Sequence, residues 1–431
     1  MEQGAKKNFS FASIAISFFI LIVLPLTITG VIISKGVIKV GEEATQANLR
    51  ILDDNQKLSI AGRAQNVGDA VAQFLTDREK DIRIATILPR DDQSYNTFLK
   101  SNTRGVIQSS NVGIVKIPVP VYKEIAFLDK TGKEILKVNT QGVVPKDKLK
   151  DMSDPANGDF GAEDYFQKAK QLAPGDIYMG NVVGYHVTKQ EFEAGKQFNG
   201  IIRIAAPVFD STGFAGVVEL ALDFSHIMEF TGHIVPTEPG MVFSKVNPDD
   251  VNYTFLIGRD GSTLAHPAQY LIGGLGADNK AVPTMDDKSY NELIKTGSGG
   301  MNVLNMGFLD ENLPKIHALA VSGKSGSFTY TVDNKRVFIA YAHIPYYGSI
   351  YSKPEGFGWV GMMVDIDKYH KLSEEKVKDI QLKVERWQKS SIVVVFVSLI
   401  LLFIIALILA RGLYRSIQKR DGAIAHLDDE D

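Results

Sequence analysis

A single arginine interrupts a strongly apolar segment of the chain. Arg203 lies within Gly200–Phe209, where every other residue is apolar. A charged side chain in a buried strand needs a compensating partner. That partner is either an anionic group of a bound ligand or a carboxylate of the chain itself, such as that of Asp223. Arg203 therefore predicts a binding site or a structural ion pair in this strand.

The other residues that we expect at such a site are aromatic and acidic. Ligand pockets combine aromatic walls with a few well-placed polar groups. We therefore select as candidate ligand-binding residues Tyr165, Tyr178, Arg203 and Asp223, with Phe127 as a wall of the pocket. Each has an alternative structural role, because the two tyrosines could be core aromatics and Asp223 could simply end its strand.

The sequence has no compact motif for catalysis or metal binding. Gly323-Lys324-Ser325 resembles the end of a phosphate-binding loop, but Ala318 occupies the position of the first glycine. The eight histidines form no H-x-x-H pair, no G-x-S-x-G motif occurs, and there are no cysteines. The net charge of −3 comes with no basic stripe. We expect no enzyme activity, no metal, no cofactor and no nucleic-acid partner.

Two uncharged apolar segments, residues 9–34 and 392–410, lie near the ends of the chain. A helix needs about 20 apolar residues to cross a bilayer. Lys6 and Lys7 precede the first segment as in a signal peptide, but no small-residue cleavage site follows it. The basic residues after the second segment favour a cytoplasmic C-terminus: Arg411, Arg415, Lys419 and Arg420. We expect two uncleaved spans, with the residues between them outside the cytoplasm.

Helical periodicity from Val40 to Leu88 precedes a region of predicted hairpins. The apolar seam of this helix either packs on its own domain or forms a dimer contact, and it consists of Ile60, Ala64, Val67, Val71 and Phe74. Apolar segments on both sides of Asp129–Gly132 and of Asp210–Gly213 predict two β-hairpins. Residues 253–266 and 336–365 repeat this plan. We therefore expect two similar α+β domains in tandem.

The order of these segments resembles the double-Cache family, the extracytoplasmic sensor modules of bacterial receptors. The resemblance covers roughly residues 35–390 and rests on the long helix and on Phe127–Leu136, Asp164–Gly180, Ile202–Phe224, Phe255–Pro267 and Gly356–Tyr369. It implies two PAS-like modules, each an antiparallel sheet flanked by helices, beside one long helix. It also implies that the membrane-distal module binds a small molecule, that the proximal module relays the signal, and that His266 has a local hydrogen-bonding role.

The amino-acid-binding branch of this family has a pocket motif that the chain keeps only in part. Tyr165 and Phe166 match the aromatic pair of that motif, and Asp223 matches the aspartate that takes the ligand amine. Glu163 stands where that branch has an arginine for the ligand carboxylate, and an acid would repel a carboxylate. The incomplete motif makes an amine, an organic acid or another polar metabolite as good a candidate as an α-amino acid.

These inferences give an expected organisation. It comprises cytoplasmic residues 1–8, a span at 9–34, a signalling or dimer helix at 35–90, a distal module at 91–230, a proximal module at 231–372, a juxtamembrane helix at 373–391, a span at 392–410 and a cytoplasmic tail at 411–431. The tail is too short for an output domain, so the chain is either part of a longer receptor or signals through a cytoplasmic partner. No glycine or proline interrupts residues 373–391, so this helix could carry a movement inward.

We expect a homodimeric sensor of a small molecule in the inner membrane of a bacterial cell, with its main domain in the periplasm. One alternative is a membrane-anchored module that presents a solute to a partner. Another is an extracytoplasmic metal-dependent enzyme, whose site would have to be assembled from residues far apart in the sequence.

Overall fold

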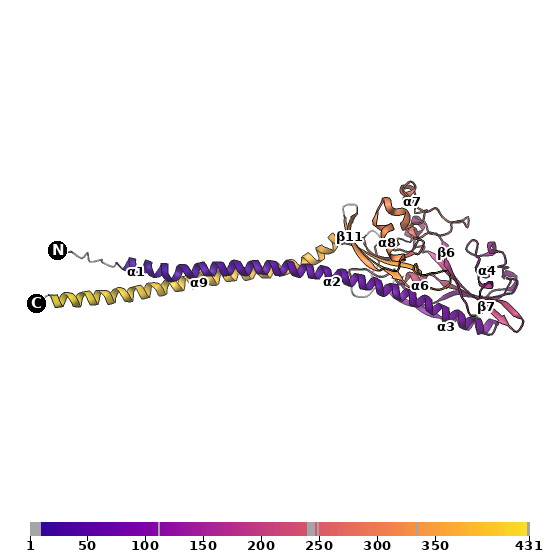
Figure 1. Cartoon of the computed structure of the whole chain (residues 1–431), viewed down its shortest axis with the longest axis horizontal. Helices are drawn as coiled ribbons and strands as arrows, with labels where there is room; N and C mark the ends of the chain where they lie inside the picture. Colours follow the sequence, from indigo (N-terminus) through magenta and orange to yellow (C-terminus); the bar gives the residue numbers. More distant parts are fainter. Residues whose placement is uncertain (1–9, 111–112, 239–245, 248–249, 333–334, 429–431) are drawn as a thin grey trace. The chain divides into compact units, whose positions relative to one another are not determined.

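A computed structural model describes residues 10–110, 113–238, 246–247, 250–332 and 335–428. The chain divides into two compact units, one of residues 1–54 and 370–431 and the other of residues 55–369. The helices α2 (Leu24–Ile87) and α9 (Ile366–Asp428) each pass from one unit into the other (Figure 1). Lys6 and Lys7, which precede the first predicted span, lie outside the described residues.

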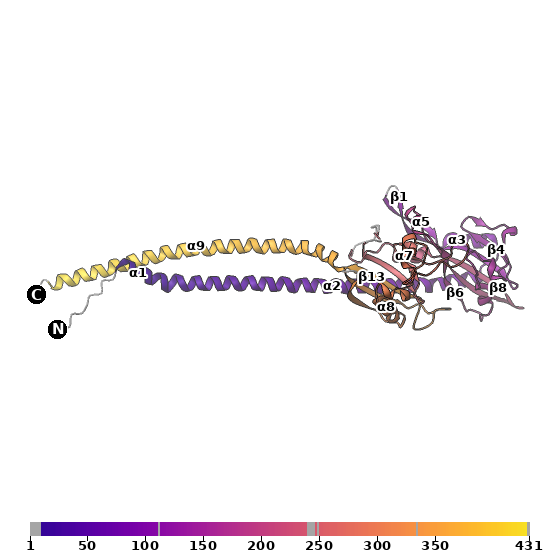
Figure 2. The same cartoon turned by 90° about the horizontal axis from the view of Figure 1, so that it is seen from above.

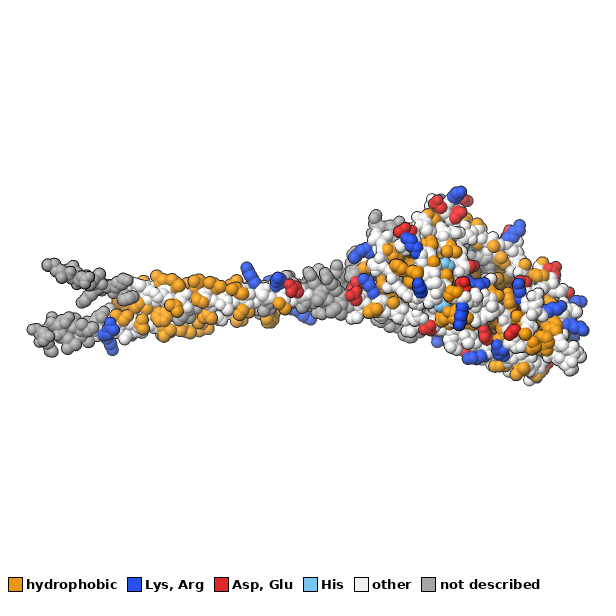
Figure 3. Space-filling model, viewed as in Figure 1, with side chains coloured by type: hydrophobic (Ala, Val, Ile, Leu, Met, Phe, Trp, Pro, Cys, Tyr) orange, Lys and Arg blue, Asp and Glu red, His pale blue; other side chains and the backbone are white. Residues whose placement is uncertain are grey.

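The first unit is helical and apolar. Here α1 (Phe11–Phe18) continues through a π-helical turn (Phe19–Val23) into α2. Two segments, Phe11–Ile33 and Ile392–Arg420, are long and apolar enough to cross a membrane. Figure 3 shows hydrophobic side chains gathered over these helices. The expectation of two apolar helices near the ends of the chain is confirmed.

The second unit contains two larger antiparallel sheets, of which the first has six strands in the order β5-β4-β3-β8-β7-β6. Its two predicted hairpins are confirmed. The Asp129 carboxylate accepts a hydrogen bond from the Thr131 amide at 2.8 Å, and Asp210 accepts one from the Thr212 amide at 2.7 Å, which fixes both turns. The strands are β3 (Tyr122–Asp129), β4 (Glu134–Asn139), β5 (Gly142–Val143), β6 (Tyr178–Tyr185), β7 (Asn199–Asp210) and β8 (Gly213–Asp223).

The second sheet has five strands in the order β10-β9-β13-β12-β11. Its run β9-β13-β12-β11 repeats the run β3-β8-β7-β6 of the first sheet, so the predicted second copy of the plan is confirmed. A separate hairpin, β1 (Thr103–Ser110) with β2 (Gly113–Pro120), precedes both sheets. The strands of the second sheet are β9 (Asn252–Gly258), β10 (Thr263–Ala265), β11 (Gly326–Val332), β12 (Lys335–Ile344) and β13 (Gly358–Asp365).

Short helices lie before and between the strands of this unit, and Figure 2 shows several of them beside the sheets. Their sequence positions place α4 before β6 and α8 before β11. They are α3 (Asp92–Ser101), α4 (Tyr165–Lys170), α5 (Lys189–Glu193), α6 (Ser225–Met228), α7 (Tyr290–Thr296) and α8 (Asn312–Val321).

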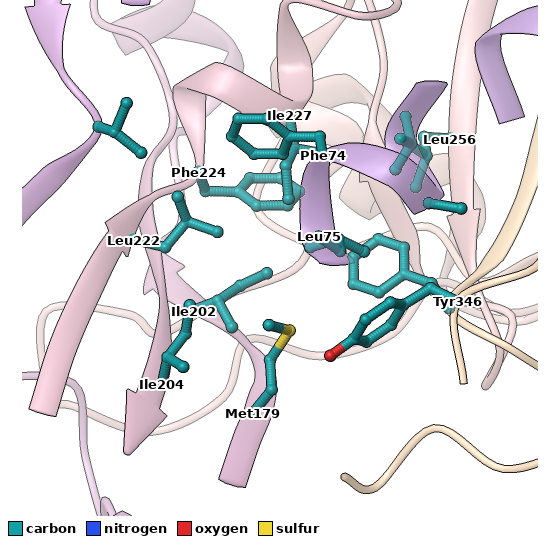
Figure 4. Packing of buried hydrophobic residues seen from close by; sticks show 14 of the residues in the cluster. Phe74, Leu75, Met179, Ile202, Ile204, Leu222, Phe224, Ile227, Leu256 and Tyr346 are labelled. Carbon is teal, nitrogen blue, oxygen red and sulfur yellow. The ribbon is translucent and has the colours of Figure 1, made fainter. Parts of the chain in front are cut away.

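One continuous core joins α2 to both sheets. In Figure 4, Phe74 and Leu75 of α2 lie among Ile202 and Leu222 of the first sheet and Leu256 of the second. The two sheets therefore share a core inside one compact unit. The expected division into a distal and a proximal module stays a prediction. The predicted seam of α2 is buried in this core, which confirms that it packs on its own domain: Ile60, Ala64, Val67, Val71 and Phe74. The dimer contact stays a prediction.

α2 is also hydrogen-bonded to both sheet regions. The Tyr122 hydroxyl on β3 donates to Asp81 at 2.6 Å, and the Tyr346 hydroxyl, just after β12, donates to Glu79 at 2.7 Å. Glu79 and Asp81 stand two residues apart on one helix. A displacement of this part of α2 would therefore act on both sheets.

Candidate functional site

Charged side chains meet on the face of the first sheet that α4 covers. They come from β3, β4, β7 and β8 and from the loops that lead from β5 into α4. Cross-strand pairing places Ala221 beside both Arg203 and Glu124, so all three share one face of the sheet. We call this group the ionic cluster, and it consists of Glu124, Glu134, Lys137, Lys150, Asp159, Glu163, Arg203 and Glu219.

Arg203 lies at the centre of the ionic cluster and is only 5% exposed. Its Nε donates to Glu163 Oε1 at 2.8 Å and its Nη2 donates to Glu163 Oε2 at 3.2 Å. Its Nη1 donates to Glu219 Oε1 at 2.7 Å and also to Glu124 Oε1. The ring centre of Tyr165, in α4, lies 5.2 Å from the guanidinium carbon. The buried guanidinium is thus compensated by the chain's own carboxylates.

Lys137 forms the second cationic centre of the cluster. Its Nζ lies 3.1 Å from Glu124 Oε1, 3.0 Å from Glu134 Oε1 and 3.9 Å from Asp159 Oδ2. Burial alone would lower the pKa of this ammonium, but the charges of Glu124 and Glu134 raise it. Lys137 therefore stays protonated and shares the Oε1 atom of Glu124 with Arg203.

Glu219 is the least compensated acid of the cluster. Its side chain is fully buried, and its Oε2 atom has no hydrogen-bond partner among the described residues. Burial, with a smaller contribution from the charge of Glu124, raises the pKa of Glu219 to about 8, although Arg203 acts in the opposite direction. Glu219 is therefore a candidate to hold a proton near neutral pH.

The structure brings three of the predicted residues to the face under α4 and corrects the expected partner of Arg203. Tyr165 and Arg203 meet in the ionic cluster, and Tyr178 pairs with Ala205 on the same face. Asp223 was the carboxylate expected beside Arg203. Its carboxylate instead lies 3.7 Å from the Lys123 ammonium and accepts a hydrogen bond from the Ser225 amide at 3.0 Å.

Phe127 is not a wall of this site. It follows Ala126 on β3, and successive side chains of a strand point to opposite faces. Ala126 packs with Tyr165 under α4, whereas Phe127 belongs to the core around α2. The Arg90 guanidinium lies over the Phe127 ring, 4.2 Å from its centre.

Sequence reasoning missed most of the acids and the second cation of the cluster. One signal was available for Glu219, which interrupts the apolar strand Gly216–Leu222 as Arg203 interrupts its own strand. Glu124 and Lys137 sit in strands that also carry other charged residues, so nothing singled them out. Glu163 was noted only as an acid that would repel a carboxylate ligand.

The turns of the two sheets fix which of their positions are equivalent. In the first sheet the Asp129 amide donates to the Lys133 carbonyl, and the Gly132 amide donates to the Asp129 carbonyl. In the second sheet Gly258 donates to Ser262, and Gly261 donates to Gly258, in the same pattern. Asp129 thus corresponds to Gly258, and positions at equal distances along β3 and β9 correspond as well.

The face of the second sheet that α8 covers is apolar where the first sheet is charged. Tyr253 takes the position of Glu124, and through the cross-strand pairs Gly361 takes that of Glu219. Ile339 takes the position of Arg203. The Phe255 ring lies directly against Gly361, where a Cβ atom would overlap it. The two equivalent faces therefore differ in chemistry, and the ionic cluster belongs to the first sheet.

The long helix before two antiparallel sheets that share a common run of strands agrees with the sequence comparison. A family model of the Cache domain matches residues 44–365. The chain belongs to the Cache domain family. This confirms the resemblance seen in the sequence and the expected fold. The Cache domain is a sensory, ligand-binding module, so the chain carries a sensor. No curated protein matches the sequence.

Solved bacterial sensory domains are similar to most of this Cache chain at low identity. The sensory domain of the Campylobacter jejuni chemoreceptor Tlp3 is 12% identical and covers 75% of this chain and 97% of its own, with a TM-score of 0.39. The ligand-binding domain of the Pseudomonas fluorescens chemoreceptor CtaA, in complex with L-isoleucine, is 14% identical and covers 75% of this chain and 98% of its own, with a TM-score of 0.37. The ligand-binding domain of the Pseudomonas aeruginosa chemoreceptor PctB, in complex with L-Arg, is 14% identical and covers 74% of this chain and 91% of its own, with a TM-score of 0.38. The ligand here must be argued from the site.

Proposed function

We propose that the chain is the sensory part of a homodimeric bacterial transmembrane receptor, with its Cache domain outside the inner membrane and its stimulus received at the ionic cluster. The observation that carries this proposal is the difference between two equivalent sheet faces. The α8 face of the second sheet has the aromatic and aliphatic filling of an ordinary core. The α4 face of the first sheet holds buried charges that a stable core would not need, since apolar replacements of buried ion pairs are often neutral or stabilising.

The charge balance of the cluster favours a cationic ligand, a small amine or guanidine. Its five carboxylates exceed its three cationic groups. Glu219 Oε2 has no hydrogen-bond partner within the described part of the chain, so it could accept a hydrogen bond from an ammonium group. An organic acid would have to compete with Glu163 for Arg203, and the negative excess would oppose it. Tyr165 adds an aromatic face that already attracts one cation.

The helices provide a route by which binding could alter the rest of the chain. β13 leads directly into α9, which is helical without interruption from Ile366 to Asp428. α2 is hydrogen-bonded to both sheet regions through Glu79 and Asp81. We infer that the ligand shifts the populations of two arrangements of the Cache domain, and that α2 and α9 carry the shift towards the cytoplasm. The output lies in a longer receptor or in a partner protein.

A ligand screen of the full chain in detergent tests this proposal. Amines, guanidines, organic acids and α-amino acids would be compared by the shift that each causes in the unfolding temperature. We expect a cationic compound to stabilise the protein, and Glu163→Gln to weaken its binding at least about 10-fold, as loss of a charged hydrogen-bond partner does. Asp223→Asn, on the same sheet, is the matched control and should bind normally. An acid that binds while all the cations fail, or a cation that binds Glu163→Gln unchanged, would overturn the proposal.

A further inference from the structure

We propose that Glu219 is a proton-binding site, so that the ionic cluster responds to pH as well as to a solute. Only its consequence for signalling rests on the proposed sensor function. The protonation itself follows from the geometry of the buried cluster, and it adds a second stimulus to the same site.

The first argument is the sharing of one donor by two acids. Glu124 Oε1 and Glu219 Oε1 both accept from Nη1 of Arg203, so two carboxylates meet at a single nitrogen. Glu124 has a second cation, Lys137, at 3.1 Å. In the part of the chain that the structure describes, Arg203 is the only cation in ion-pair contact with Glu219. When two carboxylates share a site, one of them keeps its proton to a higher pH. The acid with fewer cationic partners is Glu219.

The second argument is the surroundings of Glu219. No residue that the structure describes donates a hydrogen bond to its buried Oε2, whereas an ionised carboxylate oxygen needs donors. The titratable and charged groups that act on it from the elements packed around it are Arg203 on β7, Glu124 on β3, Lys137 on β4 and Tyr165 on α4. Glu163, ahead of α4, lies beyond Arg203 and pairs with it. Burial raises the pKa of Tyr165 well above its ordinary value, so this phenol stays neutral and supplies no charge.

The reaction is a simple exchange. As the pH rises, the Glu219 carboxyl releases its proton to water and becomes a carboxylate, which adds one negative charge to a cluster where carboxylates already outnumber cations. A cation that enters the site would compensate that charge. A proton and a cationic ligand therefore compete for Glu219, and binding of the ligand is expected to be tighter at higher pH.

Infrared difference spectra of the ligand-free full chain in lipid nanodiscs, recorded from pH 6 to pH 10, test the proposal. We expect the band of one protonated carboxyl group to disappear with a midpoint near pH 8. Glu219→Gln should remove this change, because glutamine has no carboxyl proton to release. Glutamine resembles the protonated acid in shape, so the packing around it should be kept. Glu191→Gln is the control, because the pKa of this exposed carboxyl is about 2 and lies outside the titrated range. It should leave the change intact.

Glu124→Gln provides a second variant in case Glu219→Gln does not fold. Removal of the neighbouring charge should move the midpoint of the same band to lower pH. The proposal is overturned if the wild-type protein shows no such titration, if the band persists in Glu219→Gln, or if Glu124→Gln leaves its midpoint unchanged. No ligand is used, so a failure here is distinct from a failure of the amine screen.

Discussion

Arg203 on β7 and Glu163 in the loop ahead of α4 form a two-point ion pair, with nitrogen–oxygen distances of 2.8 Å and 3.2 Å, across 40 residues of sequence. The pair fastens the loop ahead of α4 to the sheet beneath it. Both side chains are buried. If the proposed ligand competes for either partner, it would loosen this connection and so change the position of α4.

Replacement of Arg203 by methionine should strongly destabilise the Cache domain. The substitution keeps most of the side-chain volume but leaves Glu124, Glu163 and Glu219 buried with less positive charge. Breaking a buried ion pair in this way costs about 3–5 kcal/mol. Urea unfolding of the full chain in detergent, followed by the fluorescence of the buried Trp359, measures the loss.

The matched control for that measurement is Arg336→Met. Arg336 also pairs with a carboxylate, that of Asp367, but both side chains are about half exposed. An exposed ion pair contributes about 0–1 kcal/mol. Similar losses for the two arginine variants would contradict the account of a buried cluster.

A double-mutant cycle should show that Arg203 and Glu163 act as a unit. Glu163→Gln alone leaves part of the Arg203 charge uncompensated, and Arg203→Met alone leaves the Glu163 carboxylate uncompensated. The double variant removes both of these uncompensated charges. Its loss of stability should therefore be smaller than the sum of the two single losses, with a coupling free energy of about 0.5–3 kcal/mol. Additive losses in the same unfolding assay would show that the pair is not coupled.

The buried His266 predicts a loss of stability in acid. Burial lowers the pKa of this imidazole to about 4 from its ordinary 6.5, and its Nδ1 accepts a hydrogen bond from the Ala268 amide at 3.0 Å. The unfolded chain therefore binds more protons between these values, and stability present above pH 6.5 is lost as the pH falls through 4. The loss amounts to about 3 kcal/mol. His266→Asn, which keeps a hydrogen-bond acceptor, should flatten this part of the curve of unfolding free energy against pH. An unchanged slope would contradict the role given to His266.

Gly361 predicts a sharp difference between two glycine substitutions. In Gly361→Ala the new Cβ would overlap the Phe255 ring, so the packed core of the second sheet must shift, at about 1–3 kcal/mol. In Gly62→Ala, in α2, the new Cβ meets no other described part of the chain within 4 Å beyond its own helical turn, and it should stabilise the helix by about 0.5–1 kcal/mol. Thermal unfolding of both variants measures the difference, and equal effects would contradict the close packing at Gly361.

The hairpins and the repeated plan could be predicted because their signals are local. Apolar segments on both sides of Asp129–Gly132 and Asp210–Gly213 determine strands and turns within about 25 residues of sequence. The edge strand β11 and the hairpin β1–β2 were not predicted. In β11, Phe328, Tyr330 and Val332 alternate with threonines, a strand pattern that was overlooked, whereas Gly105 and Gly113 interrupt the pattern of the β1–β2 region.

The partner of Arg203 could not be predicted because it depends on long-range pairing. A lone arginine in an apolar strand required a carboxylate, and Asp223 was the natural choice at the end of the neighbouring strand. The choice among Asp223, Glu219 and Glu163 depends on the strand register and on the course of the loop before α4. A shift of one residue moves a side chain to the other face. The same alternation of side chains places Phe127 on the opposite face of β3 from the ionic cluster.

The most direct test of the central claim is hydrogen–deuterium exchange of the full chain in nanodiscs, with and without the cation that the screen selects. The account predicts ligand-dependent protection in residues 159–170 and in β7 and β8, which carry the ionic cluster, with smaller changes in the second sheet. Protection centred on β9, β12 and β13, with no change around Glu163 and Arg203, would contradict it.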